Sequence, residues 1–429
     1  MGIVSEHSAI QVNFSDEIHV SFNKEVLLKL TLYLVWGFIL LHFSRGFFTR
    51  IPFLSDYVDE VIVCFYLGSI LLSLPAWMNR FCLVDYIFYF LNVFYFLACY
   101  ILFPNNEEFL TETATLCIFC TFPCYFVGKV IEIEKVFNTF VLISSLAIIA
   151  NVLYFFFYYS ATKVVNQAAM QDNMWYAYQA MPHVCLLLWA SLEKFRIWKL
   201  AIFTLGVVFL LSCGTRGPFV CIAFFGIIYF FFYMKFKGAI YFKIGILLLG
   251  AILIATLEEV LLFFVQTFTN LKLSTRIIEK IVSGELGNDS HRSVLREKLM
   301  SALDSSNHFF GLGIWGCRNY DIIYPHFLPL DFLCSYGYVV GSILLSLLIA
   351  LIVFAFWVTR GSRNQIFLLF LFSIGLIKLL LSSSFLLEPY FFILVGYCVQ
   401  QILNKHTKLL LTNNDSARKD SAFIPLETA

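Results

Sequence analysis

The stretch IIYPHFLPLDFLCSYGYVVG, residues 322–341, predicts the start of a membrane-spanning helix with a histidine at its mouth. Beyond His326 the segment is largely apolar, and the apolar run continues past Gly341. An α-helix that crosses a bilayer needs about 20 mostly apolar residues. An imidazole at such a mouth is either an ordinary interfacial side chain or a catalytic group, so its meaning depends on the topology of the chain.

The composition excludes an ordinary soluble protein. Of the 429 residues, 60% are hydrophobic and only 13% are charged, and the mean hydropathy is +0.83. A soluble domain cannot hide so much apolar surface from water. The net charge of +1 offers no general attraction to nucleic acid, and none is expected as a partner.

The apolar runs predict an all-α, polytopic integral membrane protein with about twelve transmembrane helices. The candidate spans centre near Leu34, Gly68, Leu91, Phe119, Ser145, Leu186, Val207, Ile227, Leu249, Leu345, Leu369 and Ile393. We expect a polar N-terminal segment at residues 1–25, a single transmembrane domain at 26–404 and a polar tail at 405–429. Residues 1–25 show no signal peptide, so the first span is expected to insert uncleaved.

Loop charges predict the orientation, because short cytoplasmic loops carry an excess of Lys and Arg. Alternate connections contain Arg80; Lys129 and Lys135; Lys194, Arg196 and Lys199; Lys235, Lys237 and Lys243; Arg360 and Arg363; Lys405 and Lys408. The other set includes the acidic PNNEEFLTE and the nearly neutral SSSFLLE, whereas the first outer connection, with Arg45 and Arg50, departs from the pattern. Both termini are therefore expected in the cytoplasm.

One connection on the expected outer side, residues 267–325, is far longer than the others. Most connections have about 4–6 residues, and long ones often carry function. Within it, RSVLREKLMSAL predicts an amphipathic helix in which Arg292 and Arg296 lie on or beside one face with Leu299 or Leu303.

Three residues on the expected outer side have the chemistry to act on a phosphorylated substrate. Arg216 lies in the tight turn SCGTRGPF, and Arg292 lies in the long loop. A guanidinium makes bidentate, charge-assisted bonds to phosphate and stays ionised in a poorly hydrated site. His326 can take a proton from a hydroxyl near neutral pH. The alternatives are that Arg216 snorkels to lipid headgroups, that Arg292 is on a solvated helix face and that His326 bonds only to local backbone.

Other polar residues point to no specific chemistry. Lys378 and the pair Glu258 and Glu259 are predicted within spans, where charges usually face a cavity or a partner, but the sequence names no partner. Cys117, Cys120 and Cys124 are expected to pack within a helix. The chain has no Asp-x-Asp metal motif and no phosphate-binding Gly-rich loop, so no cofactor and no metal site are expected.

These motifs, taken in order, resemble the O-antigen polymerase and ligase family of bacterial envelope enzymes. The resemblance covers chiefly residues 211–341. It rests on SCGTRG, HRSVLREKLMSAL and FFGLGIWG, followed by His326 with Leu330 and Gly337 four and eleven residues later. Phe327 follows the histidine, where ligases usually carry Asn, Ser or Gln, and this favours a polymerase.

The resemblance implies a metal-independent glycosyltransferase at the periplasmic face of the inner membrane, with 267–325 as a periplasmic loop. The donor would be an oligosaccharide on undecaprenyl diphosphate, in contact with membrane lipid, and a chain-length regulator protein is an expected partner. His326, Arg292 and Arg216 are the expected catalytic residues. Substrate contacts are expected from both arginines together with Arg296, His308, Gly311 and Gly313.

Two alternatives to the polymerase stay open at this point. A ligase would transfer the glycan to the lipid A core. A flippase for lipid-linked glycans would suit twelve spans with cytoplasmic ends equally well, although transporters often show internal repeats, and none is evident between the halves of this chain.

Overall fold

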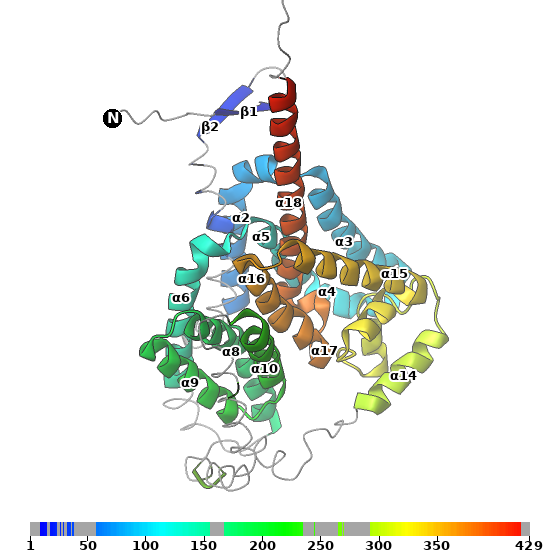
Figure 1. Ribbon diagram of the computed structural model, residues 1–429. Coiled ribbons are helices and arrows are strands. Elements are labelled where there is room, and N and C mark those ends of the chain that lie inside the picture. The colour runs from blue at the N-terminus through cyan, green and yellow to red at the C-terminus, as the bar shows by residue number, and fades with distance from the viewer. Residues whose placement is uncertain are drawn as a thin grey trace, which may run out of the picture.

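The computed structural model describes residues 9–14, 18–23, 57–154, 167–234 and 292–421, with a few separate positions among residues 26–37 and 244–269. Nearly all the regular structure in this part of the chain is helical (Figure 1). The expected span near Leu249, Glu258, Glu259 and most of 267–291 lie outside the described residues.

In chain order, the main α-helices of the described residues are α2 (Val58–Arg80), α3 (Leu83–Leu102), α4 (Glu107–Thr115), α5 (Cys124–Val130), α6 (Ile133–Tyr154), α8 (Gln167–Glu193), α9 (Ile197–Ser212), α10 (Gly217–Ile228), α14 (Arg292–Asp304), α15 (Leu328–Val358), α16 (Arg363–Leu371), α17 (Lys378–Leu381) and α18 (Pro389–Ser421). Short 3-10 or π segments are η3 (Pro104–Asn106), η4 (Leu116–Thr121), η6 (Tyr229–Tyr233), η8 (Gly316–Tyr320), η9 (Phe372–Ile377) and η10 (Phe385–Leu387).

The helices are of the kind expected for a multi-pass membrane protein. Within the described residues, five helical stretches are long and apolar enough to cross a bilayer: Leu83–Leu102, Pro104–Val130, Ile133–Leu153, Leu328–Val358 and Arg363–Leu381. Shorter apolar helices cover Val63–Ser73, Ile197–Ser212 and Gly217–Tyr233. The helical character is confirmed, and these apolar helices are consistent with a multi-pass membrane protein, while the count of twelve spans stays a prediction.

The N-terminal segment forms a small antiparallel hairpin. Strand β1 (Ala9–Phe14) pairs with β2 (Ile18–Asn23), from Ala9 opposite Asn23 to Phe14 opposite Ile18. The sequence alternates here, with Ile10 and Val12 separated by polar residues, which is the period of a strand. The expected all-α fold is therefore found in the described helical domain, and these two strands depart from it.

The connections gather at two ends of the helical domain. At one, the Arg363 guanidinium lies 2.8 Å from Glu134 and 2.9 Å from Glu193. At the other, Arg292 contacts the Leu381 carbonyl. Because one helical stretch runs from Arg363 to Leu381, we name these the Arg363 end and the Arg292 end.

Close helix crossings fix the middle of the fold. A Cβ on Gly128 would overlap the backbone of Ile393, and one on Gly396 would overlap the Tyr125 carbonyl. Small residues let helices approach closely where lipid provides no hydrophobic drive between them. Helices α5 and α18 therefore lie in direct backbone contact. The three cysteines Cys117, Cys120 and Cys124 are buried nearby, which confirms the expected packing role.

Helix α15 is broken near its start. Gly337 has φ 78° and ψ 172° inside the helix, a conformation that L-residues with side chains avoid. The loop before α15 closes the break, because Leu312 N–H donates to the Cys334 carbonyl at 2.8 Å and Val339 N–H donates to the His308 carbonyl at 3.1 Å. Backbone groups freed at the break are thereby satisfied, as a membrane helix requires.

Candidate functional site

At the Arg292 end, His326 lies within electrostatic range of two arginines of α14. The predicted amphipathic helix is confirmed at Arg292–Asp304, with Leu299 and Leu303 buried. Arg292 and Arg296 are four residues apart, so one helical face presents both guanidinium groups. The charges of both act on His326, which brings together two of the three predicted catalytic residues.

Burial and the two neighbouring cations make the imidazole hard to protonate. Burial, followed by the charges of Arg292 and Arg296, lowers the pKa of His326 from its usual 6.5 to about 4. Both causes disfavour a charged imidazolium. At neutral pH the ring is therefore uncharged and can accept a hydrogen bond through one nitrogen.

The backbone holds His326 in an uncommon conformation. Its φ is +56°, in the left-handed region that residues other than Gly, Asn, Asp and His rarely adopt. The ring centroid lies 4.3 Å from that of Tyr324. Among the described residues, no hydrogen-bond partner lies near its buried Nδ1. A buried polar atom without a partner invites a ligand or water.

The Arg296 guanidinium packs over the ring of Phe327, the residue at which ligases usually carry Asn, Ser or Gln. Its Cζ lies 5.0 Å from the ring centroid of Phe327, which is within cation–π range. Its buried Nε also lacks a partner in the described part of the chain. Phe327 thus orients a guanidinium beside His326, a contact that Asn, Ser or Gln would not supply.

Arg292 ties α14 to the segment between α17 and α18. Its Nη1 donates to the Leu381 carbonyl at 2.8 Å. Ser384 and Phe385 follow Leu381 by three and four residues. The Ser384 Oγ and the Phe385 N–H donate to the buried Asp331 carboxylate at 2.7 Å and 3.2 Å. Since Asp331 lies in the first turn of α15, the 381–388 segment links the arginine helix to the helix that follows His326.

Tyr178 of α8 connects this cluster to the Arg216 turn. The turn between α9 and α10 is confirmed, with Gly214 at φ 67°. A Cβ on Gly217 would overlap the Tyr178 hydroxyl, so Tyr178 touches the residue after Arg216. The same side chain is within electrostatic range of Arg292. Arg216, partly exposed, therefore lies at the same end as the other two predicted catalytic residues.

Lys378 has a partner that sequence reasoning missed. Its ammonium forms an ion pair with Glu388, and the two side chains are 15% and 1% exposed. The ammonium also lies 5.3 Å from the Tyr178 ring centroid. Glu388 is the single carboxylate of SSSFLLE at the mouth of the following span. That lone acid ten residues after Lys378 was the available signal, whereas nothing marked Tyr178.

His308, Gly311 and Gly313 lie at the break in α15, a separate part of this end. The His308 carbonyl caps Val339, and its ring lies 5.7 Å from that of Tyr338. Gly311 has φ +63°, and a Cβ there would lie 2.6 Å from the Cys334 carbonyl. A Cβ on Gly313 would meet the Phe103 ring. Close backbone approach accounts for Gly311, and a φ of +76° beside the Phe103 ring accounts for Gly313. Their contact with substrate stays a prediction.

Three hydrogen bonds of Asn106 and an ion pair of Arg318 hold this loop in place. Asn106 Nδ2 donates to the carbonyls of Leu312 at 3.1 Å and Ile314 at 3.0 Å, and its Oδ1 accepts from Asn319 at 2.6 Å. Arg318 reaches Glu112 at 2.6 Å. The loop before His326 is therefore fixed both to η3, between α3 and α4, and to α4 itself.

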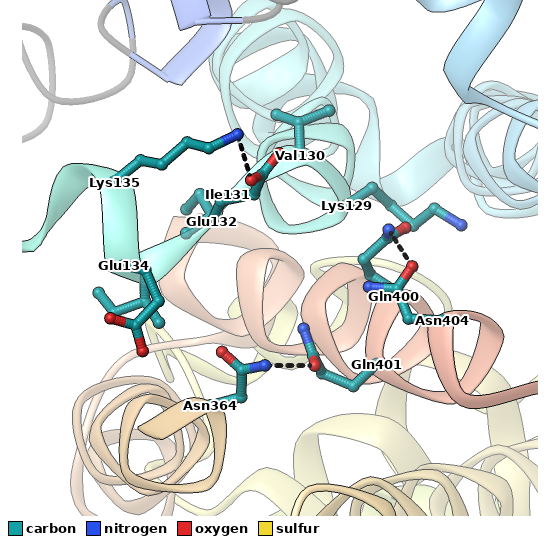
Figure 2. A pocket seen from close by; sticks show the side chains of 11 residues that line it. Lys129, Val130, Ile131, Glu132, Glu134, Lys135, Asn364, Gln400, Gln401 and Asn404 are labelled. Carbon is teal, nitrogen blue, oxygen red and sulfur yellow. Dashed lines mark hydrogen bonds and ion pairs between the residues drawn. The ribbon is translucent and has the colours of Figure 1, made fainter. Parts of the chain in front are cut away.

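A polar pocket of about 470 Å³ lies at the Arg363 end. Its lining includes carboxamides of α16 and α18, with Asn364 Nδ2 donating to Gln401 Oε1 at 3.0 Å and Gln400 Nε2 donating to Asn404 Oδ1 at 3.0 Å (Figure 2). Charged groups around it are paired, as in Glu132 with Lys135 at 2.6 Å. None of the predicted site residues lines it.

Comparison with known proteins places the chain in no family. No protein-family model, no curated protein and no solved structure matches it.

Proposed function

We propose that this protein is an O-antigen polymerase, which joins oligosaccharide repeat units carried on undecaprenyl diphosphate. The observation that carries the proposal is the placement of His326 beside Arg292 and Arg296, with the Arg216 turn joined to Arg292 through Tyr178. Transfer of a sugar from a lipid diphosphate needs a base for the acceptor hydroxyl and positive charge for the departing diphosphate. The neutral His326 imidazole and the neighbouring arginines can supply these two functions.

In this reaction an acceptor hydroxyl oxygen forms a bond to the anomeric carbon of the donor sugar. The bond between that carbon and the phosphate oxygen breaks, and its electron pair leaves with the lipid diphosphate. The hydroxyl proton moves to a nitrogen of His326. Arg292 and Arg216 stabilise the negative charge that develops on the departing diphosphate, which lowers the barrier if that contact is stronger in the transition state.

Donor binding also prepares the base. The positive charges of Arg292 and Arg296 contribute to the low pKa of His326. A bound diphosphate offsets these charges, so the pKa of the imidazole rises when the donor is present. His326 then becomes a stronger base at the moment when the acceptor has to lose its proton.

We propose the bacterial inner membrane as the location, with the Arg292 end in the periplasm and both termini in the cytoplasm. Lys and Arg in the connections at the Arg363 end support this orientation through the positive-inside tendency. An epitope inserted after Ser305 should be accessible from outside spheroplasts. A fluorescent protein fused to the C-terminus should fold and fluoresce inside the cell.

The decisive experiment deletes the gene and returns variants of it. Loss of a polymerase leaves lipid A core capped by a single repeat unit, whereas loss of a ligase leaves the core uncapped and the glycan on its lipid carrier. His326→Ala and Arg216→Ala should each abolish the long-chain ladder while the protein still inserts. Normal ladders from both variants would refute these roles.

A further inference from the structure

The ion pair of Lys378 and Glu388 joins α17 to the residue just before α18, where the Glu388 carboxylate also meets the backbone of Tyr390. Lys378 lies in the stretch Arg363–Leu381, which is apolar enough to cross the membrane. It directly follows the π-helical turn η9. Charges inside spans are costly and usually mark a functional site, and π turns are frequent there as well.

The two members of the pair differ in exposure. The Glu388 side chain is 1% exposed and that of Lys378 is 15% exposed. An ammonium has three donors, so one bond to Glu388 leaves others for a ligand. Glu388 is therefore placed to hold the lysine, and Lys378 is placed to meet something outside the protein core.

Lys378 lies next to the groups that hold the proposed donor site. Arg292 bonds to the carbonyl of Leu381, which is three residues from Lys378 in the same helix α17. Positions three apart share a helix face. The Lys378 ammonium also packs over Tyr178, whose hydroxyl touches Gly217. Lys378 is thus linked to the Arg292 contact through α17 and to the Arg216 turn through Tyr178.

We propose that Lys378 is a third cation of the donor site, which binds an oxygen of the lipid diphosphate and is held in place by Glu388. The inference rests on the proposed function, because it takes the diphosphate as the ligand. A diphosphate bears several negative oxygens, and two arginines with one lysine match them better than two arginines alone. The competing explanation is that the pair only braces α17 against the start of α18.

Replacing both Lys378 and Glu388 by uncharged residues tests whether the pair binds diphosphate or only braces α17 against α18. Lys378→Met alone would leave Glu388 buried without a partner, which is strongly destabilising. The double variant Lys378→Met with Glu388→Leu removes both charges, and such apolar replacements of buried pairs commonly keep the fold. Lys378→Gln with Glu388→Gln repeats the test with a polar pair if the apolar pair does not fold.

The measurement is direct binding of undecaprenyl diphosphate to the purified full-length protein in nanodiscs, with undecaprenol as the uncharged control. We expect each folded double variant to bind the diphosphate about tenfold or more weakly than the parent, which is the loss of one charge-assisted contact. Lys378→Arg should retain most of the affinity, and undecaprenol binding should not change.

Parental affinity in a folded double variant would overturn the inference and leave the pair as a brace. No sugar transfer is needed for this readout, so the two proposals can fail separately. If the parent protein binds undecaprenyl diphosphate no better than undecaprenol, the proposed function fails. If the parent binds it and the double variants bind it equally well, only the role of Lys378 fails.

Discussion

The Arg292 guanidinium donates a 2.8 Å hydrogen bond to the carbonyl of Leu381, 89 residues further along the chain. This contact fixes α14 against the mouth of the helix that carries Lys378. A planar guanidinium has five donors, so one bond to a carbonyl still leaves donors for a phosphate.

Arg292→Lys should therefore be a poor substitute. A lysine ammonium cannot reproduce the forked geometry that serves a carbonyl and a phosphate at once, and we expect the rate of polymerisation to fall about tenfold or more. The measurement is the ladder formed in membranes by each variant. Arg360→Ala, on the exposed connection after α15, is the matched control and should leave the ladder unchanged. A normal ladder from Arg292→Lys would contradict a bidentate role.

His326 predicts the pH dependence of the reaction. Because its pKa in the free protein is about 4, the imidazole stays neutral from pH 8 down to about pH 5. The apparent second-order rate constant should be flat over that range as far as this group is concerned, and should fall as pH approaches 4. The corresponding profile at saturating donor should fall at a higher pH, since the bound diphosphate offsets Arg292 and Arg296. If the two pH profiles fall at the same pH, the bound donor does not raise the pKa of His326.

The same shift predicts an effect on stability. The pKa of His326 is lower in the folded protein than in the unfolded chain, where it is about 6.5. Between these values the unfolded chain binds the extra proton, so the folded state loses stability as pH falls from 6.5 towards 4. Thermal unfolding of His326→Gln should lack this component. An unchanged pH slope in the variant would show that the histidine is not buried beside the arginines.

Gly337 should not tolerate a side chain. An alanine Cβ would lie 2.5 Å from the Phe309 carbonyl carbon, at a backbone φ of +78°. Strain of this kind costs about 1–3 kcal/mol before the overlap is counted, so Gly337→Ala should lower the unfolding temperature markedly. Gly68→Ala is the control, because its Cβ would meet nothing within 4 Å and α2 should gain about 1 kcal/mol of helix propensity. Equal unfolding temperatures for the two variants would contradict the break in α15.

Asn106 should be the most sensitive side chain in the contact between the long loop and η3. Asn106→Ala removes three hydrogen bonds, two of them to the carbonyls of Leu312 and Ile314. Buried carbonyls left without donors cost about 1–3 kcal/mol each, so the loop should open locally. Faster proteolysis between residues 305 and 327, with α18 still protected, is the expected readout. Asn404→Ala, at the Arg363 end, should leave the cleavage rate unchanged.

Local patterns determined much of this protein from sequence. Long apolar runs predict membrane helices because lipid cannot satisfy exposed backbone groups, and the described spans follow them. The i, i+4 spacing of Arg292 and Arg296 predicts α14, and Gly214 with Gly217 predicts the turn at Arg216. Each of these signals lies within a few residues, so no distant contact was needed to read it.

Tertiary structure alone decided how these pieces meet. The pairing of Lys378 with Glu388, the contact of Tyr178 with Gly217 and the break in α15 join segments whose order in the chain says nothing of their distance in space. The charge state of His326 depends on burial and on two arginines from another helix. Electrostatic and packing energies depend on separation in space, and that separation is set by the whole fold.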